Sequence, residues 1–221
     1  TEISQRRHIP FLQGRWMLQV FDKPVEEGGI LVYRHRERAH STTRNYYNWL
    51  FSQGASSNGD GSSFIGGQVS IKDTAGLHQT AAATISLSDT PSQNIEVTTA
   101  AYGFLAAAAI DTRGIVVGSG VTAFDFEQYV LITQIVNGTG SGQLTHVASE
   151  LPLLSYVAGT KTLTHTHARF FNNNSGGTVS VNEVAMYERG AAATGAVTWM
   201  VERTKLGSTV SVLNTGQLKV T

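Results

Sequence analysis

The sequence predicts a mainly β protein: an antiparallel β-sandwich of jelly-roll type, with one short α-helix and an extended N-terminal arm. Short alternating apolar and polar segments recur from residue 111 onward at intervals of about 8–12 residues, separated by turns rich in Gly and Asn. Charged residues make up only 14% of the 221-residue chain, against about 25% in typical soluble proteins, and 23 residues are Gly. Such a composition favours sheets that pack against other chains.

The N-terminal residues 1–14 are predicted to form the arm, and residues 15–221 a single β-sandwich domain. The arm is basic, lacks apolar periodicity and contains Pro10, so it is unsuited to its own core. A segment of this kind is ordered on contact with a neighbouring subunit. The predicted interface residues are therefore Arg6, Arg7, His8, Ile9 and Pro10.

The first regular elements are a hairpin and a helix. Residues 16–21 and 30–33 are strand-like and flank a Pro- and Gly-containing turn, which predicts a hairpin whose second strand continues into the basic run 34–38. Residues 41–53 predict the helix, capped by Ser41 and ended by Gly54. Its apolar stripe is expected to comprise Tyr47, Leu50 and Phe51.

The remaining chain is predicted to be almost entirely strands and turns. Residues 106–109 are left open between helix and sheet, residues 122–129 are predicted to form one irregular or helical turn, and residues 130–136 to form a short strand or docking segment. The Asn- and Gly-rich run 172–177 predicts a hairpin turn. The expected strands are 64–71, 95–97, 114–118, 143–149, 162–171, 178–187, 196–204, 209–213 and 217–221.

No set of catalytic residues is evident. The chain has no Cys, which excludes thiolate chemistry, and no G-x-S-x-G motif. Asp125 and Glu127 are the closest carboxyl pair, but they are more typical of a polar turn than of a glycosidase pair. The chain is therefore predicted not to be an enzyme and to need no cofactor.

One pair of potential metal ligands stands out. His165 and His167 are two apart on a predicted strand, so they share a face, and symmetry copies could complete a six-nitrogen site. No further ligand is identifiable within the chain, so the favoured interpretation is a pair facing solvent or a neighbouring strand, with no metal. The Asp/Asn/Gly loop at 54–63 lacks the carboxylates of an EF-hand.

The charge and hydropathy patterns limit which partners are expected. Lys and Arg number 16, as do Asp and Glu, so no global field attracts nucleic acid, although eight of the basic residues lie in residues 1–44. No run of about 18 apolar residues is present, so no membrane span is expected. The N-terminal residues also lack the apolar core of a signal peptide.

One segment has a polar pair inside a predicted strand. Along residues 178–187, Val179, Val181 and Glu183 share one face, and neither face is cleanly apolar. Hydrogen bonds from Asn182 and Glu183 are therefore expected to help fix the strand register, as structural groups rather than as a site.

Three stretches of the sequence together resemble those of known proteins. They are residues 38–51 (RAHSTTRNYYNWLF), residues 115–144 with their Gly-rich turns, and residues 169–187 (RFFNNNSGGTVSVNEVAMY). In this order they resemble a group of structural proteins of tailed phages and prophages. The resemblance implies a virion component of tail, baseplate, fibre or capsid-associated type, made in the host bacterial cytoplasm. It implies self-assembly and contact with other virion proteins, and no catalytic residue.

A second function class is a carbohydrate-binding or adhesin-type β-sandwich module that recognises a host surface glycan. Such a module is expected to present aromatic side chains in its loops. The loops at 54–63, 137–142 and 172–177 carry none, so the structural role is favoured.

Overall fold

The computed structural model describes residues 13–39, 41–54, 70–80, 103–192 and 195–221. Several expectations lie outside these residues. They concern the interface residues of the arm (Arg6, Arg7, His8, Ile9 and Pro10), the loop at 55–63, the first part of the strand at 64–71 and the strand at 95–97.

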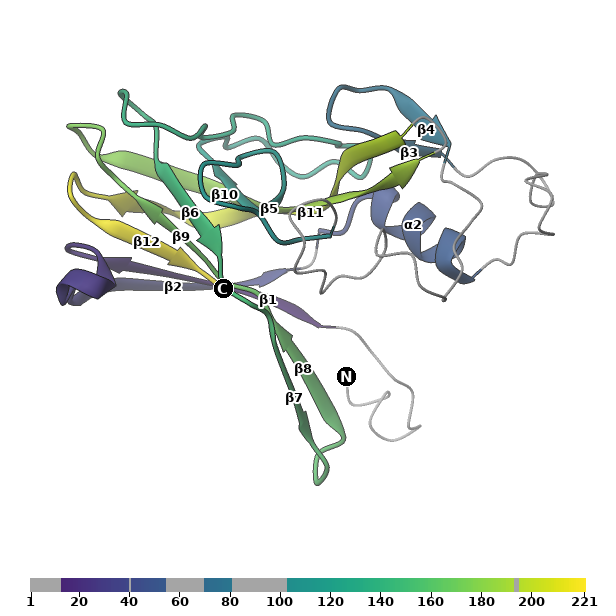
Figure 1. Cartoon of the computed structure of the whole chain (residues 1–221), viewed down its shortest axis with the longest axis horizontal. Helices are drawn as coiled ribbons and strands as arrows, with labels where there is room; N and C mark the ends of the chain where they lie inside the picture. Colours follow the sequence, from purple (N-terminus) through teal and green to yellow (C-terminus); the bar gives the residue numbers. More distant parts are fainter. Residues whose placement is uncertain (1–12, 40, 55–69, 81–102, 193–194) are drawn as a thin grey trace.

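The larger sheet has five strands in the order β2-β1-β12-β9-β6 (Figure 1). Their bounds are β1 (Gly14–Phe21), β2 (Leu31–Ala39), β6 (Thr145–Ser149), β9 (Arg169–Asn172) and β12 (Gln217–Val220). The predicted first hairpin is confirmed, and β2 continues through the basic run as expected, although β1 begins at Gly14 rather than Trp16. A 3-10 turn, η1 (Val25–Glu27), lies between the two strands.

The second sheet has three strands in the order β11-β10-β5. They are β5 (Gly114–Gly118), β10 (Val179–Ala192) and β11 (Gly195–Val212), and β11 joins the two strands that were predicted at 196–204 and 209–213. Both sheets contribute to one hydrophobic cluster, in which Leu18 and Leu218 of the first sheet join Val117, Val181 and Val210 of the second. This cluster is the main core.

Two small hairpins and one helix complete the described chain. The hairpins are β3 (Ser70–Lys72) with β4 (His78–Thr80), and β7 (Leu153–Val157) with β8 (Thr162–Thr166). The helix is α2 (Arg44–Gly54), and residues 106–109 form a turn. The mainly β, antiparallel class with a single short helix is confirmed for the described residues. Among them, no helix is long and apolar enough to span a membrane.

The run at 172–177 is not a hairpin turn, contrary to prediction. It connects β9 to β10, and these strands belong to different sheets. Asn173 explains the crossover, because its buried side-chain amide donates hydrogen bonds to the carbonyls of Gly177 and Val212, each at 2.7 Å. Its Oδ1 also accepts from the Ser175 amide at 3.0 Å. The segment is therefore fixed against the end of β11.

The predicted strand at 162–171 is two strands. β8 ends at Thr166, β9 begins at Arg169, and the two belong to different sheets. At the break, Ala168 is buried and its carbonyl accepts a hydrogen bond from the Glu150 amide at 2.9 Å. The chain therefore leaves the five-stranded sheet after β6, forms the β7–β8 hairpin and returns at β9.

The helix begins three residues later than predicted, and Ser41 does not cap it. Residues 41–43 lie along β11 instead, where the backbone amide of Arg203 donates a hydrogen bond to the Ser41 carbonyl at 3.1 Å. The expected apolar stripe is also wrong at Tyr47, whose side chain is 53% exposed. The helix buries Asn45 and Trp49, because Asn45 pairs with the Lys72 backbone through two hydrogen bonds.

Candidate functional site

The β7–β8 hairpin projects away from both sheets (Figure 1). Every residue of β7 and the first three residues of β8 are exposed. A short turn closes the hairpin, with Lys161 in the left-handed region at φ 52°. Because a lone two-stranded hairpin is marginally stable in water, an exposed hairpin of this kind is expected to be covered by another surface.

The two faces of the hairpin differ in polarity. Residues directly opposite each other in an antiparallel pair lie on the same face. The register pairs Tyr156 with Leu163 and Leu154 with His165, so these four side chains share one face. Leu154 is 59%, Tyr156 61% and Leu163 64% exposed. The other face carries Ser155, Thr162, Thr164 and Thr166 beside Leu153 and Val157.

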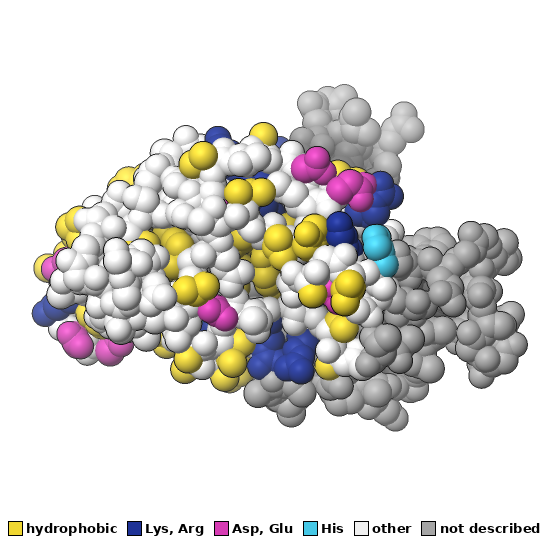
Figure 2. All heavy atoms as spheres, turned by 90° about the horizontal axis from the view of Figure 1, so that it is seen from above, with side chains coloured by type: hydrophobic (Ala, Val, Ile, Leu, Met, Phe, Trp, Pro, Cys, Tyr) yellow, Lys and Arg dark blue, Asp and Glu magenta, His cyan; other side chains and the backbone are white. Residues whose placement is uncertain are grey.

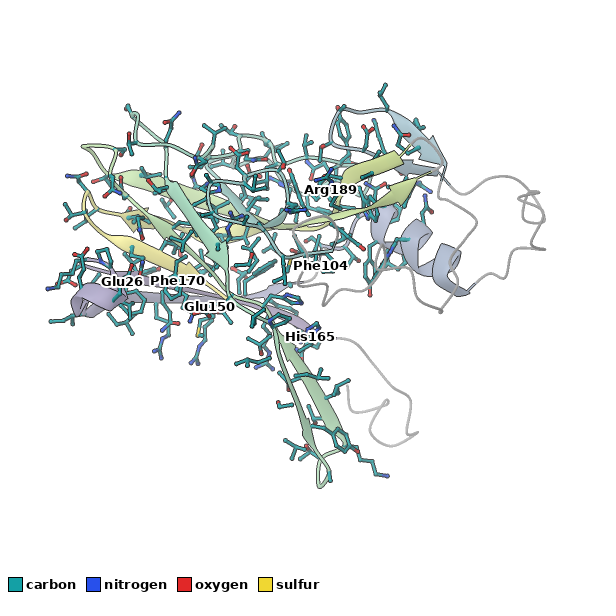
Figure 3. The ribbon with its side chains drawn as sticks, viewed as in Figure 1. Glu26, Phe104, Glu150, His165, Phe170 and Arg189 are labelled. Atoms are coloured by element: carbon teal, nitrogen blue, oxygen red, sulfur yellow. The ribbon has the colours of Figure 1, made fainter. Side chains whose placement is uncertain are left out.

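At its base, the apolar face meets the histidine pair predicted from the sequence. The rings of His165 and His167 are 4.3 Å apart between centroids, and His167 packs edge-on to Phe104 at 5.7 Å. Figure 3 labels His165 at the base of the hairpin and Phe104 on the body nearby. Burial, and then the neighbouring His165, lower the pKa of His167 to about 4. His167 is thus a neutral packing group at neutral pH.

A metal site at these histidines gains no support from the described residues. Among them, no three His, Asp or Glu side chains come together in a way that could hold a metal ion. The pair does lie together, as predicted, and His167 packs against the ring of Phe104. The structure therefore places these residues in a packing role beneath the hairpin.

A second exposed surface lies on the edge strand β2. Ile30, Leu31, Val32 and Tyr33 are all exposed and lie at the start of this strand or just before it. The second half of β2 approaches β11, where Glu37 accepts a hydrogen bond from the Gly207 amide at 3.0 Å. An exposed apolar edge is a template for pairing with another chain. The open part of the edge is therefore a further assembly candidate.

The surface seen from above in Figure 2 is mostly uncharged. Lys, Arg, Asp and Glu side chains are scattered across it singly or in small groups. Weakly charged surfaces repel other copies of the same chain only weakly.

The carboxyl pair predicted as a polar turn has that arrangement. Asp125 accepts a hydrogen bond from the Glu127 amide at 2.7 Å. The Glu127 carboxylate faces Arg44, whose Nε donates to both of its oxygens at 2.7 and 2.8 Å. The two carboxylates therefore do not face one another across a groove.

The polar pair predicted to help fix the strand register makes most of its hydrogen bonds to residues 119–133. Glu183 is fully buried and accepts hydrogen bonds from the amides of Gly120 and Thr133 at 3.1 and 2.9 Å. It also forms a 2.6 Å ion pair with the equally buried Arg203. Asn182 donates to the Ser119 carbonyl at 3.0 Å. These contacts tie residues 119–133 to β10.

A second buried cation, Arg169, was not predicted. Its guanidinium donates to backbone carbonyls at 2.9 Å from Val147 and 3.0 Å from Ile115, and also to Ile110. Burial lowers its pKa to about 10, so it stays protonated at neutral pH. Arg169 thus holds three segments together. Its position in the sequence gave no signal, because its partners are backbone groups from distant residues.

Two buried carboxyl groups have raised pKa values. Glu202 accepts a hydrogen bond from the Trp16 indole at 2.9 Å, and burial raises its pKa to about 8. Burial also raises the pKa of Glu188 well above its usual value, and the Glu188 oxygens have no hydrogen-bond partner. A raised pKa can mark a catalytic acid. Here both pKa values are raised mainly because burial disfavours the charged carboxylate.

No family model matches the chain, and no curated protein or solved structure was found to be similar to it.

Proposed function

We propose that this chain is a non-enzymatic structural protein that assembles with copies of itself, and that its setting is the particle of a tailed phage. The observation that carries the assembly role is the projecting β7–β8 hairpin with its apolar face. The phage setting rests on the resemblance of residues 38–51, 115–144 and 169–187. A sandwich arrangement of the two sheets around their shared core belongs to the same proposal.

The energetic argument favours a protein surface as the partner of the hairpin. Burying an exposed Leu, Val or aromatic side chain contributes about 1.5–3 kcal/mol. The face formed by Leu154, Tyr156 and Leu163 leaves that contribution unused in a single copy. The Tyr156–Leu163 pair lies beside the Thr side chains of β8. This mixture of apolar and polar groups is typical of an interface that forms after folding.

The test replaces one cross-strand pair. The variant Tyr156→Thr/Leu163→Thr removes the apolar face but keeps strand-forming residues. We expect assembly to weaken at least about 100-fold, as measured by sedimentation velocity over a concentration series. Because both side chains are exposed, thermal unfolding of the body should change little.

The matched control is the neighbouring cross-strand pair on the other face, Ser155→Ala/Thr164→Ala. This control should assemble like the unmodified chain. If both double variants assembled equally well, the hairpin face would not be an interface. If the unmodified chain bound a surface glycan and stayed monomeric, the adhesin-type function would replace the proposed one.

A further inference from the structure

The β1–β2 hairpin carries a face of unpaired arginines. Arg34, Arg36 and Arg38 alternate along β2, so they point to the same side, and all three are exposed. Arg15 lies directly opposite Arg38 and is exposed as well. We call these four residues the arginine face.

This face points away from the core. The residues between the arginines, His35 and Glu37, lie opposite Leu18 and Trp16, which are buried. In the described part of the chain, none of the four arginines forms an ion pair. Lys219 of β12 lies opposite Gln19 on the same side, but it pairs with Glu150 at 3.0 Å. The four guanidinium groups are therefore held close together with their charges unbalanced.

The other end of the same hairpin is acidic. Glu26 and Glu27 are exposed in η1, and Figure 3 labels Glu26 at this end. Val25 and Ile30, both exposed and apolar, flank the two acids. Lys23 offsets one of the three acids in residues 22–30, and we call this segment, which stays net negative, the acidic turn.

The acidic turn has a fixed conformation. The Asp22 carboxylate accepts a hydrogen bond from the Ile30 amide at 2.7 Å, and Gln217 of β12 accepts one from the Val25 amide at 3.0 Å. At Gly29, a Cβ atom would lie 2.1 Å from the Lys23 carbonyl oxygen, so only glycine fits this turn. A surface that is already ordered loses little conformational entropy when it binds.

The two charged surfaces cannot neutralise each other within one copy. Arg34 is three residues along β2 from Leu31, which is roughly 10 Å, Arg36 is five residues away, roughly 17 Å, and Arg38 and Arg15 lie farther still. Electrostatic interactions in solvent are screened over about 8 Å at physiological ionic strength. Complementary contact is therefore available only between copies.

We propose that the arginine face of one copy binds the acidic turn of a second copy, head to tail. Charge complementarity favours a second copy as the partner. The chain has 16 basic and 16 acidic residues and separates a group of each sign on one hairpin. Arginine is suited to such contact because its planar guanidinium binds carboxylates in a bidentate manner. This inference rests on the proposed self-assembly. A heterologous contact of this kind generates rings or filaments.

The test is a charge exchange between the two surfaces. The face variant is Arg34→Glu/Arg36→Glu/Arg38→Glu, and the turn variant is Glu26→Lys/Glu27→Lys; Asp22 is kept because it fixes the turn. Each variant alone should lose assembly at least about 100-fold in sedimentation velocity, because like charges then face each other. An equal mixture of the two variants should assemble again, and so should one chain that carries all five substitutions.

Several results would overturn the inference. The first is a face variant that assembles like the unmodified chain. The second is a mixture that fails to assemble although both variants melt at the normal temperature. A loss confined to the face variant would assign the arginines to another anionic partner, such as nucleic acid. If the unmodified chain itself never assembles, the proposed function fails, and with it this contact.

Discussion

Buried polar side chains at the residue scale connect the irregular segments of this protein to its sheets. The ion pair of Glu183 with Arg203 has no exposed side-chain surface, and Arg203 also donates to the Thr122 carbonyl at 2.8 Å. A buried pair contributes little net stability relative to apolar residues, but removing one partner leaves a buried charge without compensation. The pair therefore mainly determines where residues 119–133 lie.

Replacing the cation of this pair should destabilise the protein strongly. We expect Arg203→Met to lower the free energy of unfolding by about 3–5 kcal/mol, as measured by urea denaturation at pH 7. The matched control is Arg44→Met, which breaks the solvent-exposed pair with Glu127 and should have a much smaller effect. Equal losses in the two variants would contradict the structural role given to Arg203.

Glu202 predicts a pH dependence of stability. Burial raises its folded-state pKa to about 8 from an ordinary value of 4.5, so the folded state binds a proton that the unfolded state has released. This contribution is fully present below pH 4.5 and is lost as the pH rises through 8. In Glu202→Gln, the slope of unfolding free energy against pH between about 5 and 8 should be less negative by about 1.4 kcal/mol per unit.

The difference between the two proteins isolates Glu202, because Glu188, His146 and His167 are present in both. His146 and His167 have pKa values lowered by burial to about 4, so their own contributions are lost as the pH falls below about 6.5. If the two stability profiles ran parallel from pH 5 to 8, Glu202 would not titrate in this range.

At this scale, the sequence indicated which residues are structural but not what they bind. Asn182 and Glu183 were recognised because they interrupt the apolar pattern of a strand. Their partners Ser119, Gly120 and Arg203 could not be predicted, because they depend on which strands lie side by side. Arg169 was missed for the same reason, since it binds carbonyl groups from 22 to 62 residues away.

At the scale of elements, the sequence predicted strands and turns better than their connections. The segments at 114–118 and 143–149 closely match β5 and β6 because their signals are local: an unbroken apolar run in β5 and an alternating pattern in β6. The run at 172–177 has the composition of a hairpin turn, yet Asn173 binds the end of β11 and the run crosses between sheets. The helix shows the same limit, since residues 41–43, which were predicted as its first turn, pair with β11 instead.

The helix therefore predicts unequal effects of two aromatic substitutions. Trp49 is buried in a cluster with Ile71, Phe104 and Trp199, so Trp49→Ala should lower the free energy of unfolding by about 3–5 kcal/mol. Tyr47 is exposed, lies outside this cluster and packs against the rings of Tyr46 and Phe126, so Tyr47→Ala should cost less than half as much. Urea denaturation of both variants measures the difference. A larger loss from Tyr47→Ala would place the wrong face of α2 against the sheet.

At the scale of the whole molecule, the low charge content predicted association but not the surface involved, and association stays a prediction. The arm at residues 1–14 stays a prediction, because residues 1–12 lie outside the described structure. β8 lies within the strand predicted at 162–171, but β7 was not expected, since residues 153–157 lack the polar alternation of a surface strand. Its apolar face and the charged ends of the β1–β2 hairpin now give the assembly proposal specific contacts.

The central claim is that this chain assembles with itself. Sedimentation velocity of the unmodified chain, from low to high micromolar concentration at physiological salt, tests it most directly. The proposal predicts species whose masses are multiples of 23.7 kDa and whose proportion increases with concentration. A single 23.7 kDa species at every concentration would contradict it.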